Sequence, residues 1–224
     1  MGDVGDAYAV CRARIAGLTA DLDAAGAAAR VPTCPSWTVH DVVAHVAGVV
    51  DDALAGRLDG VATDPWTAAQ VEARRDRSIP EMLAEWDAQA PGFEALLDQI
   101  GDPGRQAVAD VVTHEHDIRT ALGVPGSRDS EAVGIGLGFT AYWLVASAGE
   151  RGVALRIEPD GADPVGPDDA AAVLAGDPFT LLRASTGRRS VDQLRELRWQ
   201  GDREAALAAF TFGPFTPAPG PIAE

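Results

Sequence analysis

The feature of the sequence that most constrains the fold is a series of four helix-length segments in its first 122 residues. In each segment apolar residues recur at helical spacing, and turn-forming residues separate one segment from the next. The second segment begins after the "CPSW" turn, where Thr38 and Asp41 form the pattern of a capping box. The four segments cover residues 3–29, 38–57, 66–100 and 102–122. Helices of this length joined by short connections predict an antiparallel four-helix bundle.

A change of pattern after Gly149 indicates a different architecture in the last third of the chain. Residues 130–148 form a fifth helical segment, which is nearly all apolar and is therefore expected to be buried. Beyond it, "VALRIE" at 153–158 and "ELRWQ" at 196–200 alternate in hydrophobicity as half-buried strands do. The stretch "DAAAVLAG" at 169–176 is compatible with a strand or with a helix.

Together these segments predict a mainly α chain of two domains. A helical bundle is expected over residues 1–149, and a small α+β domain over residues 150–224. The second domain ends in a proline-rich tail, "FGPFTPAPGPIAE", which cannot form a regular helix.

The charge balance limits the kinds of partner that the chain can have. Its 18 basic and 34 acidic residues give a formal net charge of -16, which would repel nucleic-acid phosphates and anionic lipid. We therefore expect no nucleic-acid partner and no membrane partner, in agreement with a mean hydropathy near zero and no long apolar run.

The two cysteines are too few for a disulfide scaffold, and the N-terminus lacks the pattern of a signal peptide. A cytoplasmic location is expected.

Histidines and carboxylates at helical spacing are the most informative polar residues. Asp110 and His114 are four residues apart, so they lie on one face of their helix, next to an apolar stripe that should face the bundle core. Burying a carboxylate and an imidazole is costly unless they are paired or coordinated. On the second segment, Asp41 and His45 have the same spacing, and Asp41 could accept the second ring N–H of His45.

The other two histidines, His40 and His116, point away from these faces and are expected at the surface. His45, Asp110 and His114 would then offer three nitrogen and oxygen ligands from two helices. Such a set, with one position left open, is typical of a catalytic divalent metal such as zinc. The alternative is two unrelated buried histidines, each hydrogen-bonded locally, and the spacing alone does not decide between them.

Four separated motifs occur in an order that resembles a known family. They are "VPTCPSWTVHDVVAHVAGVV", "PWTAAQVEARRDRS", "VVTHEHDIRTALGVPG" and the closing "GRRS…WQGD…FGPFTP". They resemble the mycothiol-dependent maleylpyruvate isomerase family, the actinobacterial branch of the DinB-like metal-binding helical bundles. The resemblance extends over nearly the whole chain and implies a DinB-like bundle followed by the α+β domain.

The resemblance implies a metal site at named positions. The family's first metal-binding histidine, in its W-T-x-x-D-x-x-x-H stretch, falls on His45. Its E-xxx-H pair falls on Asp110 and His114, so an Asp stands where the family has Glu. Because Asp is one methylene shorter, the alternatives are direct binding, binding through water, or replacement by Asp117 or Glu115.

The resemblance also implies a cofactor and a reaction class. The expected cofactors are a divalent metal, with zinc as the default, and mycothiol, a low-molecular-weight thiol that would act as the nucleophile. The expected partner is a small-molecule electrophile, and the chain would be a monomer or a homodimer. Cis-trans isomerisation of maleylpyruvate and thiol S-transfer would use the same ligands. A non-catalytic metal- or ligand-binding protein of the same fold is the alternative.

Three residues near these motifs have simpler expected roles. Cys34 is expected to pack as a small apolar residue, and Trp37 and Trp66 are expected to line the core or a cleft.

Overall fold

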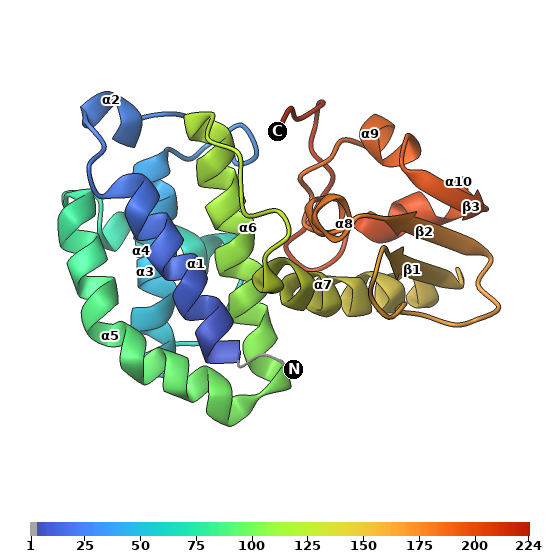
Figure 1. Cartoon of the computed structure of the whole chain (residues 1–224), viewed down its shortest axis with the longest axis horizontal. Helices are drawn as coiled ribbons and strands as arrows, with labels where there is room; N and C mark the ends of the chain where they lie inside the picture. The colour runs from blue at the N-terminus through green and yellow to red at the C-terminus, as the bar shows by residue number, and fades with distance from the viewer. Residues whose placement is uncertain (1–3) are drawn as a thin grey trace. The chain divides into compact units, whose positions relative to one another are not determined.

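The computed structural model describes residues 4–224 and divides them into two compact units (Figure 1). One unit extends to Gly126, and the other covers Ser127–Ala223. This division differs from the boundary expected after residue 149. The nearly apolar fifth helix packs against helices and a strand of the C-terminal part, so it belongs to the second unit.

The N-terminal unit is a bundle of four long helices. These are α1 (Val4–Thr19), α3 (Val39–Leu54), α5 (Ile79–Ile100) and α6 (Arg105–Leu122). Three shorter elements accompany them: α2 (Ala24–Ala27), α4 (Asp64–Ala73) and the 3₁₀ turn η1 (Asp102–Gly104). Each of α1 and α3 packs against both α5 and α6, and α4 packs on α3. The predicted four-helix bundle is confirmed.

Local capping signals explain where several of the helices begin. At the start of α3, Thr38 and Asp41 form the capping box that the sequence indicates. Ser78 and Glu81 form another at the start of α5, which separates α4 from α5 within the predicted 66–100 segment. The first predicted segment also divides. It ends at Thr19, and Asp23 caps the short helix α2 by accepting a hydrogen bond from the backbone N–H of Gly26.

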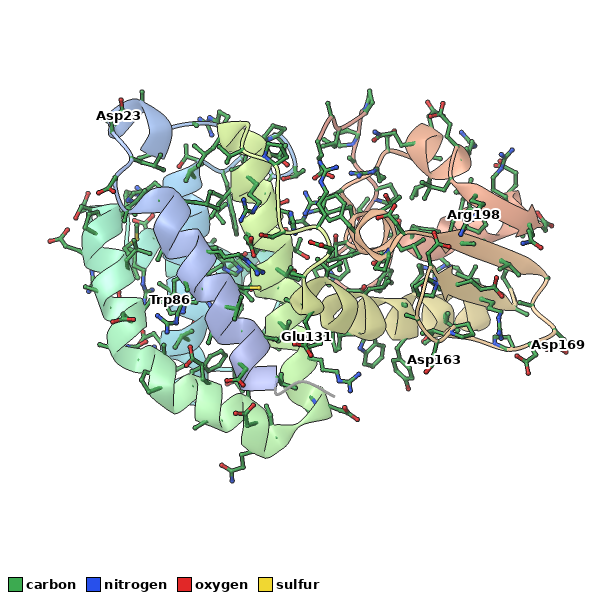
Figure 2. All side chains as sticks on the ribbon, viewed as in Figure 1. Asp23, Trp86, Glu131, Asp163, Asp169 and Arg198 are labelled. Carbon is green, nitrogen blue, oxygen red and sulfur yellow. The ribbon has the colours of Figure 1, made fainter. Side chains whose placement is uncertain are left out.

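Aromatic side chains fill the bundle between α1 and α5. Trp86, labelled in Figure 2, is fully buried and donates its indole N–H to the Tyr8 hydroxyl over 3.2 Å. The Tyr8 ring meets Trp86 and Phe93 edge to face, with centroids 6.2 and 5.0 Å apart. Such pairs add about 0.5–1.5 kcal/mol each beyond the area that they bury.

The second unit packs helices against a three-stranded sheet. Its helical elements are α7 (Glu131–Glu150), α8 (Pro178–Ser185), α9 (Val191–Arg195), α10 (Arg203–Leu207) and the 3₁₀ turn η2 (Ala208–Phe210). The strands are β1 (Leu155–Pro159), β2 (Ala172–Gly176) and β3 (Arg198–Gly201), in the order β1-β2-β3. β1 pairs parallel with β2, and β3 pairs antiparallel with it. The ambiguous stretch at 169–176 therefore contains the central strand.

Helix α7 forms part of the core of this second unit. It contacts α8, β1 and η2, and its Leu137 and Leu144 are buried. By length and composition it does reach the range of a membrane span, contrary to the expectation of no long apolar run. Its most apolar window has a mean hydropathy of 1.4, and half of that window is buried within the structure. A buried core helix of a globular unit has the same properties.

Candidate metal centre

Helices α3 and α6 each place one histidine on the side where the two helices meet. In α3, Val42, Val43 and Val46 are buried, and His45 lies among them with 2% of its surface exposed. In α6, His114 is 7% exposed. Because both rings are buried, each imidazole nitrogen needs a partner within the protein or in a bound ligand.

Asp110 joins the two imidazoles. Its Oδ1 atom lies 3.6 Å from Nε2 of His45 and 3.6 Å from Nε2 of His114, and the two ring centroids are 5.0 Å apart. The three ligand atoms all lie within 4.8 Å of one another. A tetrahedral ion with bonds of about 2.0–2.2 Å separates its ligand atoms by roughly 3.3–3.6 Å. The donor set and its spacing therefore fit a divalent ion bound by His45, Asp110 and His114.

Exposure differs between the ligands. The Asp110 side chain is 33% exposed, whereas those of His45 and His114 are 3% and 8% exposed. The carboxylate side of the group therefore faces solvent. A small molecule could reach the group from that side, and the imidazole side is closed.

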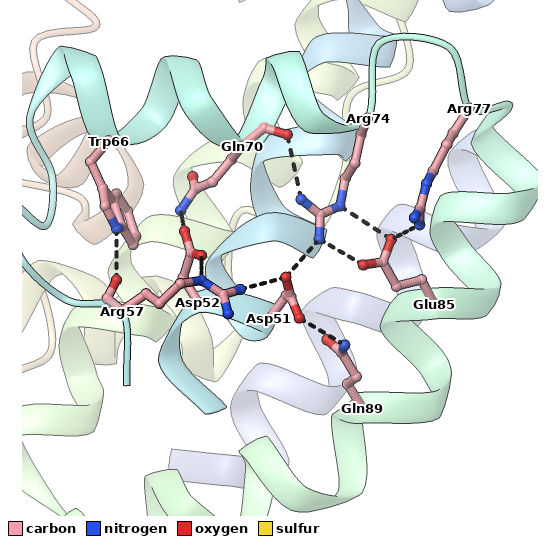
Figure 3. Close-up of polar contacts among 9 residues, drawn as sticks. All are labelled: Asp51, Asp52, Arg57, Trp66, Gln70, Arg74, Arg77, Glu85 and Gln89. Carbon is pink, nitrogen blue, oxygen red and sulfur yellow. Dashed lines mark hydrogen bonds and ion pairs between the residues drawn. The ribbon is translucent and has the colours of Figure 1, made fainter. Parts of the chain in front are cut away.

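The second nitrogen of His45 has a partner that the sequence did not predict. Nδ1 lies 2.7 Å from Oε1 of Gln70, a buried residue of α4. Gln70 in turn donates its Nε2 to Oδ2 of Asp52 over 2.7 Å (Figure 3). The prediction that Asp41 accepts this ring N–H was wrong, because the Asp41 carboxylate accepts the backbone N–H of Thr38 in the capping box.

The second nitrogen of His114 faces a different carboxylate. Nδ1 lies 3.1 Å from Oδ2 of Asp117, which is fully buried, although this contact is not aligned as a hydrogen bond. The Thr33 hydroxyl donates to the other oxygen of Asp117 over 2.8 Å, and Sγ of Cys34 lies 3.8 Å from Oδ2. Cys34, His114 and Asp117 thus form a second close group of possible ligands. The Cys34 thiol therefore lies against a carboxylate at the edge of the site, which differs from the apolar packing role expected for it.

Neither acidic alternative to Asp110 lies where it could replace that residue. Asp117 lies on the Nδ1 side of His114, whereas Asp110 lies on the Nε2 side. The Glu115 carboxylate is fully buried and binds Nε of Arg14 at 2.9 Å and Nε of Arg119 at 2.8 Å. Glu115 therefore has a structural role, in which it joins α1 to α6.

Aromatic rings surround the two imidazoles. The Trp37 ring centroid lies 5.1 Å from that of His45 and 5.8 Å from that of His114, nearly parallel to the latter. The Trp66 ring meets His45 edge to face at 6.5 Å. The site is therefore walled by apolar surface, as expected for Trp37 and Trp66, which strengthens electrostatic interactions inside it.

The remaining histidines differ in their surroundings. His40 is partly exposed, and its Nε2 lies 2.7 Å from the backbone oxygen of Arg77. The surface position expected for His116 was wrong, because that residue is 3% exposed. Helix α6 packs against α1 as well as α3, so residues that point away from the histidine face are buried as well.

Comparisons with known proteins identify the family and the fold of the chain. Residues 8–123 match the family described as "Mycothiol maleylpyruvate isomerase N-terminal domain". A crystal structure of a mutant of the mycothiol-dependent maleylpyruvate isomerase matches with a TM-score of 0.58 and 10% sequence identity, over 83% of this chain and 88% of that chain. At this identity the match shows a shared fold. No curated protein matched the sequence.

Proposed function

Because the chain belongs to the mycothiol maleylpyruvate isomerase family, we propose that it is a metal-dependent enzyme that uses mycothiol as its nucleophile. The observation that carries the proposal is the convergence of His45, Asp110 and His114 from two helices on one point. Two histidines and one carboxylate are a usual ligand set for a catalytic zinc ion, which keeps a further position for water or substrate.

His45, Asp110 and His114 would hold the ion. When bound, the ion supplies the positive charge that keeps a thiol at the open position in its reactive thiolate form. The protein orients the ligands: Gln70 holds the His45 ring, and Asp117 lies against the His114 ring. The exposed side of Asp110 gives access to the thiol and to its acceptor.

The proposed reaction is the cis-trans isomerisation of maleylpyruvate. The thiolate sulfur forms a bond to one carbon of the conjugated double bond, and the electron pair of that double bond moves into the adjoining carbonyl. Rotation about the resulting single bond then becomes free. When the carbon–sulfur bond breaks, the electron pair returns, and the trans product fumarylpyruvate leaves with the thiol regenerated. If the enolate instead takes up a proton from solvent at carbon and the adduct is released, the enzyme is an S-transferase.

Metal analysis tests the site first. The purified protein should bind about one divalent ion per chain, and His45→Ala, His114→Ala and Asp110→Ala should each weaken that binding. Loss of a residue that supports a ligand lowers metal affinity by about 10–100-fold, so loss of a ligand itself should lower it by at least as much. His40→Ala is the matched control, because His40 lies on α3 but contacts the backbone of Arg77. Equal metal content in all four variants would contradict the site.

Turnover tests the reaction. The metal-loaded protein is incubated with maleylpyruvate with and without mycothiol, and the product is separated by chromatography. Formation of fumarylpyruvate that requires mycothiol supports the isomerase. A stable mycothiol adduct supports S-transfer, and turnover that does not depend on the thiol would refute the proposal.

A further inference from the structure

His45 is the last member of a chain of polar contacts whose hydrogen-bonding roles are fixed by their chemistry. The other members, Arg57, Asp52 and Gln70, are drawn in Figure 3. The chain starts at Arg57, which donates Nε to Oδ1 of Asp52 over 2.8 Å and Nη2 to Oδ2 of Asp51 over 2.6 Å. A guanidinium has donors only, and a carboxylate paired with it has acceptors only. Asp52 can therefore accept a hydrogen bond from its next neighbour and cannot donate one.

That neighbour is Gln70. A glutamine side chain carries a donor NH₂ and an acceptor oxygen, and the two can exchange places by rotation. Here the rotation is determined, because only the NH₂ group can face Asp52, at 2.7 Å. The opposite orientation would press the amide oxygen against a carboxylate oxygen in a partly buried environment. Oε1 of Gln70 must therefore face His45.

The ring of His45 is the last member of the chain. Its Nδ1 lies 2.7 Å from Oε1 of Gln70, which can only accept, so Nδ1 must carry a hydrogen. A neutral imidazole has one N–H, so Nε2 carries the lone pair. This is the nitrogen that lies 3.6 Å from Oδ1 of Asp110.

We propose that Arg57, Asp52 and Gln70 lock His45 in the Nδ1–H tautomer and direct its Nε2 lone pair at the candidate metal position. Gln70 is thus a positioning residue, acting on a ligand that comes from another helix. The link from tautomer to metal affinity rests on the proposed function, whereas the tautomer itself does not. His45 and Asp52 lie seven residues apart on α3, so one side chain from α4 spans both.

A glycine in α3 leaves room for the Gln70 side chain. Gly48 lies between His45 and Asp52, and a Cβ atom added there would come within 2.6 Å of Cβ of Gln70. The absence of a side chain at this position lets α4 approach closely enough for Gln70 to reach both partners.

The tautomer can be read directly by two-bond ¹H–¹⁵N correlation spectra of the metal-free protein, at a pH at which the imidazoles are neutral. Wild-type His45 should give the Nδ1–H pattern. Gln70→Met removes the acceptor and should abolish the preference for that pattern. Asp52→Asn keeps the size of the side chain but allows the Gln70 amide to rotate, so it should also weaken the preference. Gln89→Met is the matched control, because Gln89 donates to Asp51 and does not contact His45.

Zinc affinity, measured by competition with a chelator, is the second readout. Gln70→Met should lower it by about 10–100-fold, as loss of a residue supporting a ligand does, and Gln89→Met should leave it unchanged. An Nε2–H pattern in wild type would overturn the proposal, as would an unchanged spectrum in both Gln70→Met and Asp52→Asn. If Gln70→Met does not fold, the wild-type and Asp52→Asn spectra decide. The expected tautomer in a protein that binds no metal would uphold this inference while refuting the proposed function.

Discussion

Gly48→Ala is a test of how closely α4 must dock on α3. The new methyl group would lie 2.6 Å from Cβ and 2.8 Å from Cγ of Gln70, and 2.9 Å from Nη1 of Arg74. Carbon atoms in contact prefer separations of about 3.5–4.0 Å, so α4 would have to retreat by roughly 1 Å. Such a shift would break or lengthen the 2.7 Å hydrogen bond between Gln70 and His45.

The change in the free energy of unfolding is the sum of one stabilising and two destabilising contributions. Alanine is favoured over glycine inside a helix by about 1 kcal/mol. Overpacking costs about 1–3 kcal/mol, and loss of the hydrogen bond to His45 costs about 1 kcal/mol. The free energy of unfolding should therefore fall by about 1–3 kcal/mol on Gly48→Ala.

Gly17→Ala in α1 is the matched control for Gly48→Ala. Gly17 is also helical, and no described atom outside its own helix lies within 4 Å of a Cβ built there. That variant should be more stable than wild type by about 0.5–1 kcal/mol, because only helix propensity changes. Urea denaturation followed by circular dichroism measures both free energies of unfolding. If Gly48→Ala were stabilised as much as Gly17→Ala, the close approach of α4 would be refuted.

Two further predictions concern groups buried in the bundle. Burial, assisted by the nearby Glu115 carboxylate, raises the pKa of the Cys11 thiol from 9.0 to about 12. Between pH 9.0 and about 12 the thiol of the unfolded chain loses its proton and that of the folded chain keeps it, so the free energy of unfolding falls as the pH rises. Cys11→Ala should remove about 1.4 kcal/mol per pH unit from this dependence, measured by urea denaturation at several pH values. An unchanged pH dependence would contradict the assignment. Arg14→Met removes one guanidinium from the fully buried Glu115 and should destabilise the protein by about 2–4 kcal/mol. Arg12→Met, whose partners are partly exposed, should cost less than about 1 kcal/mol in the same assay, and equal losses would refute the role of burial.

Local sequence signals predicted the four-helix bundle, but the predicted segments 3–29 and 66–100 each contain two helices. Capping residues act within three or four positions, so Thr38 and Asp41 identified the start of α3 without knowledge of the fold. The approach of His45, Asp110 and His114 could also be anticipated, because the i, i+4 spacing places two of them on one face and the family resemblance supplied the third. Their role as metal ligands stays a prediction.

Contacts between elements distant in the sequence could not be predicted in this way. Gln70 gave no signal, because its two partners depend on where α4 docks. His116 was wrongly expected at the surface, because periodicity on one helix does not reveal that α1 covers its other face. The domain boundary differed for the same reason: a nearly all-apolar helix such as residues 130–148 can complete the core of the segment before it or of the segment after it.

Because α4 is short, binding of an ion at the candidate site should change how often this helix opens. Gln70 is the one buried residue among those that the structure describes in this ten-residue helix, so little apolar surface holds α4 in place. Any ligand that requires the docked helix stabilises it by RT ln(1 + [L]/Kd). Slowing of amide hydrogen exchange along α4 would therefore report ion uptake at a centre to which this helix contributes no ligand atom.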